Sequence, residues 1–597
     1  MQSSQASQEP AAVGRHEIRR WNGLGIVAGI VLAGVAFLIV YPMLRMAGAV
    51  MGGESIAPHF GIDPSIWQVF WNTFVVVGGS SLIALAFGTA LALINERTDG
   101  GFRGVGNFMP IAPLMLPSIT GVLGWVVLFD PRVGLVNVAL RSIFGWGAVS
   151  GEGPLNIYTM SGLIFAMSIH MVPTIYLVVS AALRNLDPSI EEASRTFGSG
   201  PLGTALRVTV PAIRPALFEA WLLAIISGIS IFAVPVIIGT GAQIEVISVR
   251  IWRYLTAYPS NQSAALVLAL AMLLMVIGLR YAKRFFAPAG RHAVVGGRGV
   301  RSAPTQLGRL RHVTRAIIVF YIALALVLPL LALMVVSVEH FWTAHIPWRH
   351  LTFDNYVNVA TRNPATSRAL INSLLLAGLS ATITTIVAGF LMIYVHQLGP
   401  AGRGGKRSRE QAAGSGRKRS REWGGRVRGM VDFVTTLPTT IPHSLIGVAF
   451  IVAFSAAPFD LYGTIWIVLL ALLVMDLPYA AASARAATDA IGHELTEASR
   501  IFRATPAGTM RRILLPLVLP GLATGWVLVF VRAFGEVTAS AILSGTSNPV
   551  VGAVLLDLWR QGSFPMMTAF ALIIWFIGSL LVLAMLWFNN RRLAKVK

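Results

Sequence analysis

The residues best suited to chemistry in this chain lie in a polar stretch that occurs twice. Residues 192–211 read EASRTFGSGPLGTALRVTVP and residues 497–516 read EASRIFRATPAGTMRRILLP, with ten of twenty positions identical at a constant offset of 305. Internal repeats of this kind indicate a duplicated structural unit. Small Ala and Ser side chains let another backbone approach closely, so the composition favours docking of a partner protein. We refer to the two stretches as the first and the second motif.

Capping residues predict that each motif forms a short, bent pair of helices. Asp187 is a good N-cap, and Pro188 is a good first-turn residue. Gly198 permits a sharp turn before a second helix begins. In the second motif, Thr505 and Pro506 repeat the combination of cap and first-turn proline. The expected product is compact, with small residues on one face and basic residues on the other.

Two ionisable residues of one apolar segment form the second group of interest. Arg532 and Glu536 lie four residues apart, so they share one face of a helix. A charge at mid-membrane costs about 2.5–3.5 kcal/mol on insertion scales, so each residue needs a reason to be there. We predict a mutual ion pair. The alternative is that Glu536 lines a translocation path, where its carboxylate meets a cation.

Other polar residues give weaker signals. Asp130, next to Pro131, predicts a loop turn at the end of a span, with a gate contact as the alternative. Isolated residues predict helix–helix hydrogen bonds, and their scatter does not predict a metal site: His170, Glu219, His443 and Asp476. The absence of cysteine excludes disulfides and thiolate metal sites. We expect no cofactor in this chain.

Composition identifies the fold class as an all-α polytopic membrane protein. Hydrophobic residues make up 55% of the 597 positions, charged residues 12%, and the mean hydropathy is +0.70. Apolar segments of at least 18 residues recur along the whole chain, which is typical of transmembrane helices. We predict about twelve spans, at 22–44, 68–94, 108–130, 158–182, 212–240, 262–282, 313–338, 369–396, 431–456, 461–484, 517–543 and 565–590. The spans at 212–240 and 517–543 are long enough to tilt or break.

Lysine and arginine positions set the orientation. With the N-terminus in the cytoplasm, most of the 47 Lys and Arg residues lie on the cytoplasmic side, together with both motifs and the C-terminus. The chain then divides into two homologous six-helix halves. The predicted boundaries are a tail at 1–21, a first half at 22–285, a flexible linker at 286–312, a second half at 313–590 and a tail at 591–597.

The second half also carries an insert, residues 399–429, which contains KRSRE twice. We interpret it as a solvated cytoplasmic loop, with contact to anionic lipid headgroups as the alternative. Aromatic residues are nearly absent from it, so nucleic-acid binding is not expected. Its AGRGGKR sequence fails as a phosphate loop because Pro400 and Arg407 replace the required Gly and Ser or Thr.

The motifs resemble those of importer-type ABC transporter permeases. In that family the pattern is Glu-Ala-Ala, three residues, Gly, nine residues and Ile-x-Leu-Pro. The matching positions are Glu192, Ala193, Gly198, Val208, Val210 and Pro211 in the first motif and Glu497, Ala498, Ile513, Leu515 and Pro516 in the second. Ser194 and Ser499 stand in the second Ala position. Arg503 stands where the family has Gly, which predicts a less tight turn.

The resemblance covers nearly the whole chain and implies a type I importer permease fold. It implies that each motif is a coupling helix that docks on one of two cytoplasmic ABC ATPases, which hold ATP and Mg, and that an external binding protein delivers the cargo. The stretches 114–137 and 555–564 are similar to the ferric-iron branch of the fused double permeases. Ferric iron is therefore the expected cargo, with thiamine, a polyamine or a phosphonate as alternatives.

Two other classes of membrane protein are alternatives to an ABC transporter permease. An ion-driven secondary transporter also uses repeats, but it would need carboxylate relays within the membrane. A membrane-embedded enzyme would need clustered His and Asp or a Ser–His arrangement inside the spans. The leading interpretation is a transport subunit of a bacterial plasma membrane without catalysis of its own.

Overall fold

The computed structural model describes residues 22–52, 65–102, 109–145, 151–286, 305–398, 415–502 and 504–596. Within these ranges the chain is helical, and its one extended pairing is an isolated bridge between Thr98 and Thr305. The first half contains α2 (Asn22–Gly52), α4 (Ser65–Arg97), η1 (Met109–Met115), α5 (Ser118–Phe129), α6 (Leu135–Phe144), α7 (Met160–Asn185), α8 (Ser189–Thr196), α9 (Pro201–Thr204), η2 (Ala205–Thr209), α10 (Val210–Ala212), α11 (Arg214–Ser230), η3 (Pro235–Gly239), α12 (Ile247–Thr256) and α13 (Gln262–Phe286).

The second half repeats this order. It contains α14 (Leu310–Ile322), η4 (Ala323–Val327), α15 (Leu328–Ser337), α16 (Asp354–Val357), η5 (Asn358–Arg362), α17 (Pro364–Gln397), α19 (Ser415–Thr436), η6 (Leu437–Thr440), α20 (His443–Phe454), α21 (Ile465–Asp489), α22 (His493–Ile501), α23 (Pro506–Thr509), η7 (Met510–Leu514), α24 (Leu515–Phe534), α25 (Thr538–Leu543), α26 (Val551–Arg560) and α27 (Phe564–Val596).

The described helices support the predicted polytopic architecture. Nine of them are long and apolar enough to cross a membrane, and the number rises to eleven if each of two bent pairs forms one span. The predicted span at 108–130 appears as η1 followed by α5, whose 12 residues are too short to be counted among the nine. Fold class and the division into two halves are therefore confirmed.

Breaks in the helices fall at prolines and glycines. Segments Pro201–Ala212 and Arg214–Ser230 meet at 74°, and segments Trp423–Thr440 and His443–Phe454 meet at 101°. A proline lacks the amide hydrogen and crowds the preceding turn, which explains the interruption near Pro442. The span predicted at 517–543 is broken as well, because α24 ends at Phe534 and α25 starts at Thr538.

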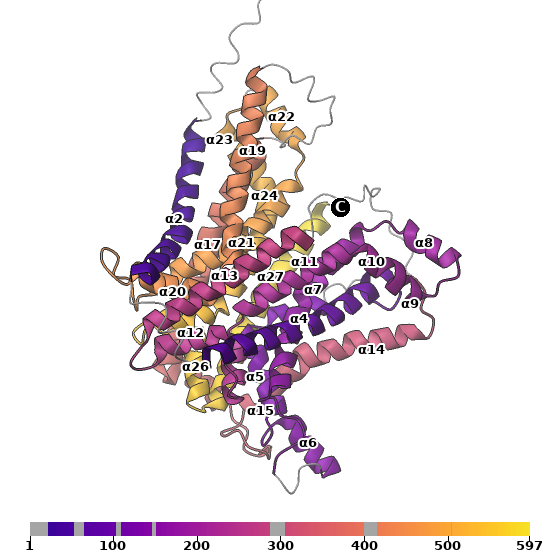
Figure 1. Cartoon of the computed structure of the whole chain (residues 1–597), viewed down its shortest axis with the longest axis vertical. Helices are drawn as coiled ribbons and strands as arrows, with labels where there is room; N and C mark the ends of the chain where they lie inside the picture. The colour runs from indigo at the N-terminus through magenta and orange to yellow at the C-terminus, as the bar shows by residue number, and fades with distance from the viewer. Residues whose placement is uncertain are drawn as a thin grey trace, which may run out of the picture.

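The two halves interlock through their first helices. Helix α2 of the first half packs on α20 of the second, and α15 of the second half packs on α5 of the first. The Tyr41 ring lies 5.8 Å from that of Phe454. On the other side Trp125 Nε1 donates to the Leu324 carbonyl at 3.2 Å. Each half therefore contributes one helix to the packing of its partner, and Figure 1 shows α2 beside the second-half helices.

The structure revises three of the predicted segments: the linker, the insert and the C-terminal tail. Residues 287–304 of the linker and the tail at 1–21 lie outside the described residues. The last part of the linker is not free, because Thr305 exchanges backbone hydrogen bonds with Arg97 and Asp99 at the end of α4. The insert is not a loop throughout, since α19 begins at Ser415 and runs toward the membrane. Helix α27 continues through Val596, so it includes nearly all of the predicted C-terminal tail.

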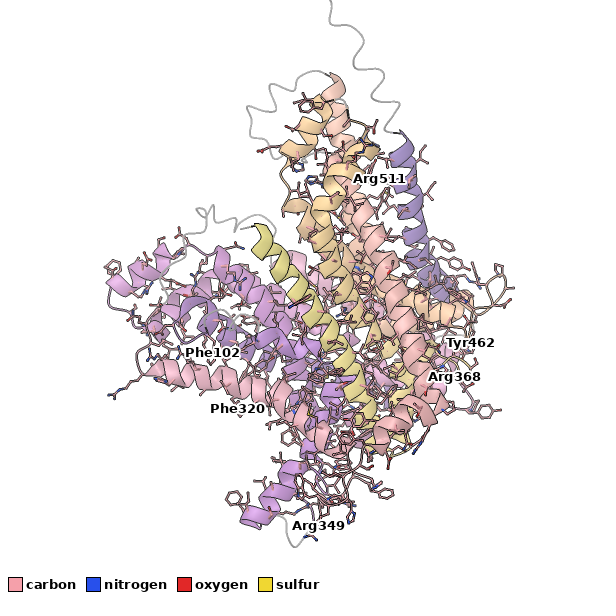
Figure 2. All side chains as sticks on the ribbon, turned by 180° about the vertical axis from the view of Figure 1, so that it is seen from behind. Phe102, Phe320, Arg349, Arg368, Tyr462 and Arg511 are labelled. Carbon is pink, nitrogen blue, oxygen red and sulfur yellow. The ribbon has the colours of Figure 1, made fainter. Side chains whose placement is uncertain are left out.

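The motif helices lie at one end of the spans, and the loop after α15 lies at the opposite end. Helix α7 leads directly into α8, and α11 returns across the membrane to α12. Figure 2 shows Arg511, which follows the second motif's α23, far from Arg349, which lies in the loop after α15. Helices α12 and α26 therefore belong to the side opposite to the motifs.

Candidate coupling and translocation site

The first motif forms the predicted bent helix pair. Helix α8 ends near Gly198, whose φ of 82° is in the left-handed region that favours glycine, and α9 begins at Pro201. Ser194 and Thr204 join the two helices through their hydroxyl groups, 3.2 Å apart. Before α8, the Asp187 carboxylate accepts the Ser189 amide hydrogen at 2.9 Å, and this bond holds the pKa of Asp187 below its usual range.

The second motif repeats the same internal bond. Ser499 and Thr509, which are 305 positions after Ser194 and Thr204, also share a hydroxyl–hydroxyl hydrogen bond between α22 and α23. Thr505 caps α23 by accepting the Gly508 amide hydrogen at 3.1 Å, as the sequence predicts. Arg503 lies outside the described residues, so the predicted looser turn stays a prediction.

A buried ion pair positions the first motif and was not predicted. Arg97, the last residue of α4, lies 3.2 Å from the Glu191 carboxylate, whose side chain is 6% exposed. Arg97 also donates to the Leu183 carbonyl at 2.7 Å, and Thr209 donates to Glu191 at 2.8 Å. The end of α4, the end of α7 and both arms of the motif are therefore held by one carboxylate and one guanidinium.

The second motif has neutral residues in the corresponding places. Thr496 stands where the first motif has Glu191, and it is buried. Gln397, the last residue of α17, donates to the Pro506 carbonyl at 3.2 Å. Sequence identity between the motifs could not reveal this contact because its residue types differ between the halves. The available signal was that Arg97 and Glu191 are charged residues that each follow an apolar segment, at 68–94 and at 158–182.

An exposed phenylalanine is the most prominent feature of each motif. Phe197 is 90% exposed and Phe502 is 86% exposed, and the two stand at the same offset of 305. Beside them Glu192 and Ala193 of α8, and Glu497 and Ala498 of α22, are also exposed. Exposed aromatic residues at equivalent positions are typical of protein contact sites. The prediction for the motifs singled out Glu and Ala and did not single out Phe, although Phe is among the ten identities.

The remaining predicted motif residues play structural parts. Ser194 and Ser499 form the internal bonds, and Ser499 is buried. Pro211 belongs to α10 and Pro516 to the first turn of α24, so each proline starts the return into the membrane. These residues therefore shape the motifs from within.

The predicted Arg532–Glu536 ion pair is wrong. Arg532 lies over the Tyr479 ring at 3.6 Å, and its Nε is 3.9 Å from the Asp476 carboxylate. Glu536 instead accepts the amide hydrogens of Ala539 at 2.9 Å and Ser540 at 3.0 Å. The helix breaks after Phe534, so the two residues no longer share a helix face, and the Glu536 carboxylate caps α25.

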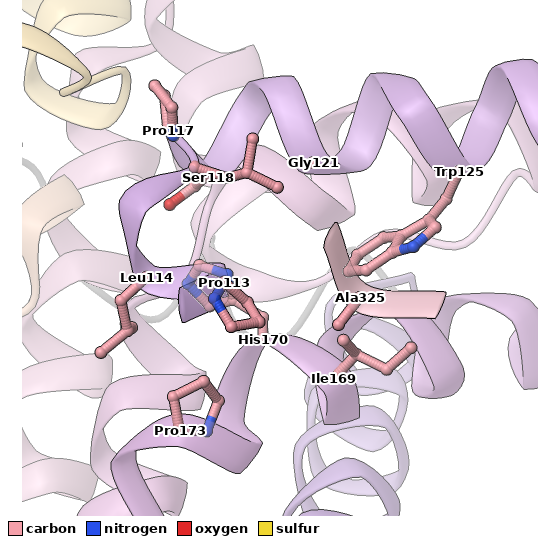
Figure 3. A pocket seen from close by; sticks show the side chains of 11 residues that line it. Pro113, Leu114, Pro117, Ser118, Gly121, Trp125, Ile169, His170, Pro173 and Ala325 are labelled. Carbon is pink, nitrogen blue, oxygen red and sulfur yellow. The ribbon is translucent and has the colours of Figure 1, made fainter. Parts of the chain in front are cut away.

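Polar side chains of both halves lie around this break, and most of them belong to the second half. Asp476 of α21 is buried and accepts a hydrogen bond from Ser380 of α17 at 3.3 Å, which is the helix–helix hydrogen bond predicted for it. His170 and His443 both lie within electrostatic range of Arg532. A cavity of about 20 Å³ beside His170, with room for about one water molecule, is lined by Pro113, Ser118 and Trp125 (Figure 3).

The two halves meet closely at this point. A Cβ built on Gly535 would lie 3.0 Å from Pro117, which precedes α5 of the first half. The backbone break of one half therefore abuts the break of the other. Among the described residues, no group of three or more His, Asp or Glu is arranged to hold a metal ion.

Asp130 takes part in a turn, which was the leading expectation for it. Its carboxylate accepts the amide hydrogens of Arg132 at 2.9 Å and Val133 at 3.0 Å. Asn137 in α6 also donates to the Asp130 carbonyl at 2.8 Å. These bonds hold α5 and α6 together at the external end of the span. The Asp130 carboxylate is thus occupied by these two amide hydrogens, and a gate contact is not required to explain its position.

Comparison with known proteins agrees with this arrangement. The family model described as binding-protein-dependent transport system inner membrane component matches residues 82–291 and again residues 413–594. The chain belongs to this family and carries its domain twice, as a fused double permease. It is thus an ABC transporter permease, a multi-pass protein of the plasma membrane, and the ion-driven secondary transporter is disfavoured.

Individual relatives extend over most of the chain. The ferric transport system permease protein FbpB of Actinobacillus pleuropneumoniae is 24% identical over 94% of this chain and 77% of its own length. The putative ferric transport system permease protein FbpB 1 of Haemophilus influenzae is 26% identical over 85% of this chain and 76% of its own length. The putrescine transport system permease protein PotI of Escherichia coli is 32% identical, but over 27% of this chain and 52% of its own length.

Proposed function

We propose that this chain forms the translocation path of an ATP-driven importer for ferric iron. In this proposal two cytoplasmic ABC ATPases, which bind ATP and Mg, dock on the two motifs, and an external binding protein delivers the cargo. The relatives named for ferric transport are similar over most of the chain, whereas the putrescine relative matches a fraction of it, which supports ferric iron over a polyamine.

The observation that carries the coupling part of the proposal is the paired surface of the motifs. Phe197 and Phe502 project at equivalent positions from helix pairs that are each braced by a Ser–Thr hydrogen bond. Each pair leads directly into a transmembrane helix, so a rotation of a docked ATPase would be transmitted to α11 or α24. Both motifs face one side when the N-terminus is cytoplasmic.

Co-purification tests the docking role. The tagged chain is purified from membranes of its own host in mild detergent, and ATP hydrolysis by the eluate is measured. We expect the double substitution Phe197→Ala and Phe502→Ala to reduce the associated activity at least tenfold, because buried aromatic anchors contribute about 2 kcal/mol or more to an interface. Phe341→Ala is the matched control, since Phe341 is an exposed phenylalanine in the external loop. Equal activity in the double variant and the control would contradict the docking role.

Uptake tests the cargo. A deletion strain should lose uptake of radiolabelled ferric iron and regain it with the intact chain, and uptake should survive collapse of the proton gradient while ATP is maintained. Putrescine and thiamine serve as competing cargoes in the same assay. Iron uptake that is unchanged by the deletion would contradict ferric iron as the cargo.

The polar region at the break between α24 and α25 is our candidate for part of the translocation path. Arg532 is 35% exposed, and a charged side chain facing lipid is disfavoured, so this exposure supports an opening onto a polar space. Glu536 lies one turn away and is held by α25. Glu536→Gln should reduce uptake at normal expression, and the matched change Glu219→Gln in the corresponding first-half span should reduce it less. Unchanged uptake in Glu536→Gln would remove Glu536 from the path.

A further inference from the structure

A cavity of about 300 Å³ lies between one helix of each half, on the side of the membrane opposite to the motifs. Helix α12 contributes Trp252, Arg253 and Thr256, and helix α26 contributes Trp559 and Arg560. The two helices occupy equivalent places in their halves, and Figure 1 shows them together at the end of the molecule far from α8 and α22. The volume is that of a small-ligand pocket.

Positive charge is in excess around this cavity. Glu245 pairs with both Arg250, at 2.9 Å, and Arg253, so one carboxylate serves two guanidinium groups. Arg560 forms no ion pair within the part of the chain that the structure describes, and it lies 5.3 Å from the Trp252 ring centre. Asp557, the one acidic residue of α26, lies three residues before Arg560 and close enough to interact with its charge, but it does not line the cavity.

Hydrogen-bond donors without partners lie in the same walls. Trp252 is 8% exposed, and its Nε1 has no hydrogen-bond partner. Thr240 Oγ1 is buried in the cavity wall and likewise has no partner. Leaving a buried hydrogen-bond donor unsatisfied costs a protein about 1–3 kcal/mol of stability. A ligand that accepts a hydrogen bond from such a donor removes this cost, which favours its binding. The lining therefore holds two guanidinium groups, two indoles and two threonine hydroxyls, and none of the lining residues carries a carboxylate.

We propose that this cavity is a binding site for a small ligand that carries oxyanion groups, such as a polycarboxylate. Arginine guanidinium groups bind carboxylates through paired hydrogen bonds, and indole donors add to this recognition. A bare trivalent cation would meet positive charge and donors here. If the proposed transport of ferric iron holds, on which this last step rests, the metal passes this point as an anionic chelate.

Calorimetric titration of the purified full chain in lipid nanodiscs tests the site directly. Citrate is the probe, and inorganic phosphate and ferric citrate are titrated in parallel to separate a free oxyanion from a metal chelate. We expect Arg560→Gln to weaken citrate binding about tenfold, which corresponds to about 1.4 kcal/mol. Arg253→Gln is the second variant, with elution from size exclusion as a check of folding because Arg253 also pairs with Glu245. Arg349→Gln is the matched control, an exposed external arginine that does not line the cavity.

The outcomes separate this proposal from the proposed function. Citrate binding that is lost in Arg560→Gln and retained in Arg349→Gln supports the site, whether or not the protein imports iron. Tighter binding of ferric citrate than of citrate supports passage of the chelate. Equal citrate affinity in the unchanged chain and in Arg560→Gln, or no citrate binding at all, overturns the site. Iron uptake that fails while citrate binding persists contradicts the ferric cargo alone.

Discussion

At the scale of single residues, the ion pair between Arg97 and Glu191 decides where the first motif sits. The pair is largely buried, and the two groups also bind backbone carbonyls and the Thr209 hydroxyl. Removing one partner of a buried pair leaves an uncompensated charge, which costs more than the pair contributes. The neighbouring Glu192 is exposed and has the same charge, so the chain supplies its own control.

We expect Glu191→Gln to destabilise the protein by about 3 kcal/mol because Arg97 loses its counter-ion. Glu192→Gln should change the stability by less than about 0.5 kcal/mol, as is usual for exposed positions. Thermal unfolding of the detergent-solubilised chain measures both. Similar unfolding midpoints for the two variants would show that the ion pair does not support the fold.

A second residue-scale prediction concerns pH. Glu339 follows α15 and is fully buried, and this burial raises the pKa of its carboxyl to about 7. The folded chain therefore keeps a proton that the unfolded chain releases above pH about 4.5. Its stabilising effect is complete below that pH and is lost as the pH rises through about 7, by at most about 3 kcal/mol.

Thermal unfolding between pH 5 and pH 8 tests this dependence. We expect the unfolding midpoint to fall with rising pH in the unchanged chain and to fall less in Glu339→Gln. Asp354→Asn is the control because Asp354 is an exposed carboxylate of the same external region, and it should keep the full dependence. The same slope in all three proteins would contradict a role for Glu339.

At the scale of elements, local residue chemistry predicted the motif helices well. Thr505 acts as a cap, and the prolines at 201 and 506 begin short helices, because these effects depend on near neighbours alone. Asp187 lies one residue before the N-cap of α8, which is Pro188, although its carboxylate does accept the Ser189 amide hydrogen. The Arg532–Glu536 pair was mispredicted since a four-residue spacing implies a shared face only in an unbroken helix. The break depends on packing against Pro117 of the other half, which no local pattern reports.

The turn between α8 and α9 gives an element-scale prediction. Gly198 has φ of 82°, so Gly198→Ala should destabilise the turn by about 1–2 kcal/mol. Gly203→Ala is the matched control, because Gly203 is helical and a Cβ there would meet nothing within 4 Å. Hydrogen–deuterium exchange of the amides in α8 should be faster in Gly198→Ala and unchanged or slower in the control. Unchanged exchange in both variants would contradict the strain.

At the scale of the whole molecule, the sequence predicted two halves but not how they join. The lengths of the apolar segments predicted the spans, and the repeat at a constant offset predicted the two halves. The exchange of α2 and α15 between the halves could not be predicted because it depends on surfaces that only the fold brings together. The cavity between α12 and α26 was missed for the same reason, since its arginines lie some 300 positions apart.

Orientation is the prediction that belongs to this scale. The chain has no cysteine, so single cysteines can be introduced without background. Thr196→Cys in α8 should resist a membrane-impermeant maleimide in intact cells and react after lysis, whereas Ser260→Cys after α12 should react in both. Labelling of Thr196→Cys in intact cells would reverse the topology and contradict ATPase docking.

The contact between Gly535 and Pro117 has a consequence for how such a protein changes its cargo during evolution. At this point the Gly535 main chain meets the ring of Pro117, and a Cβ on Gly535 would lie 3.0 Å from that ring. Arg532 and Glu536, which we propose for the translocation path, stand beside this contact and do not form it. A substitution at either position can therefore change the chemistry of this region while the meeting point of the two backbones stays as it is.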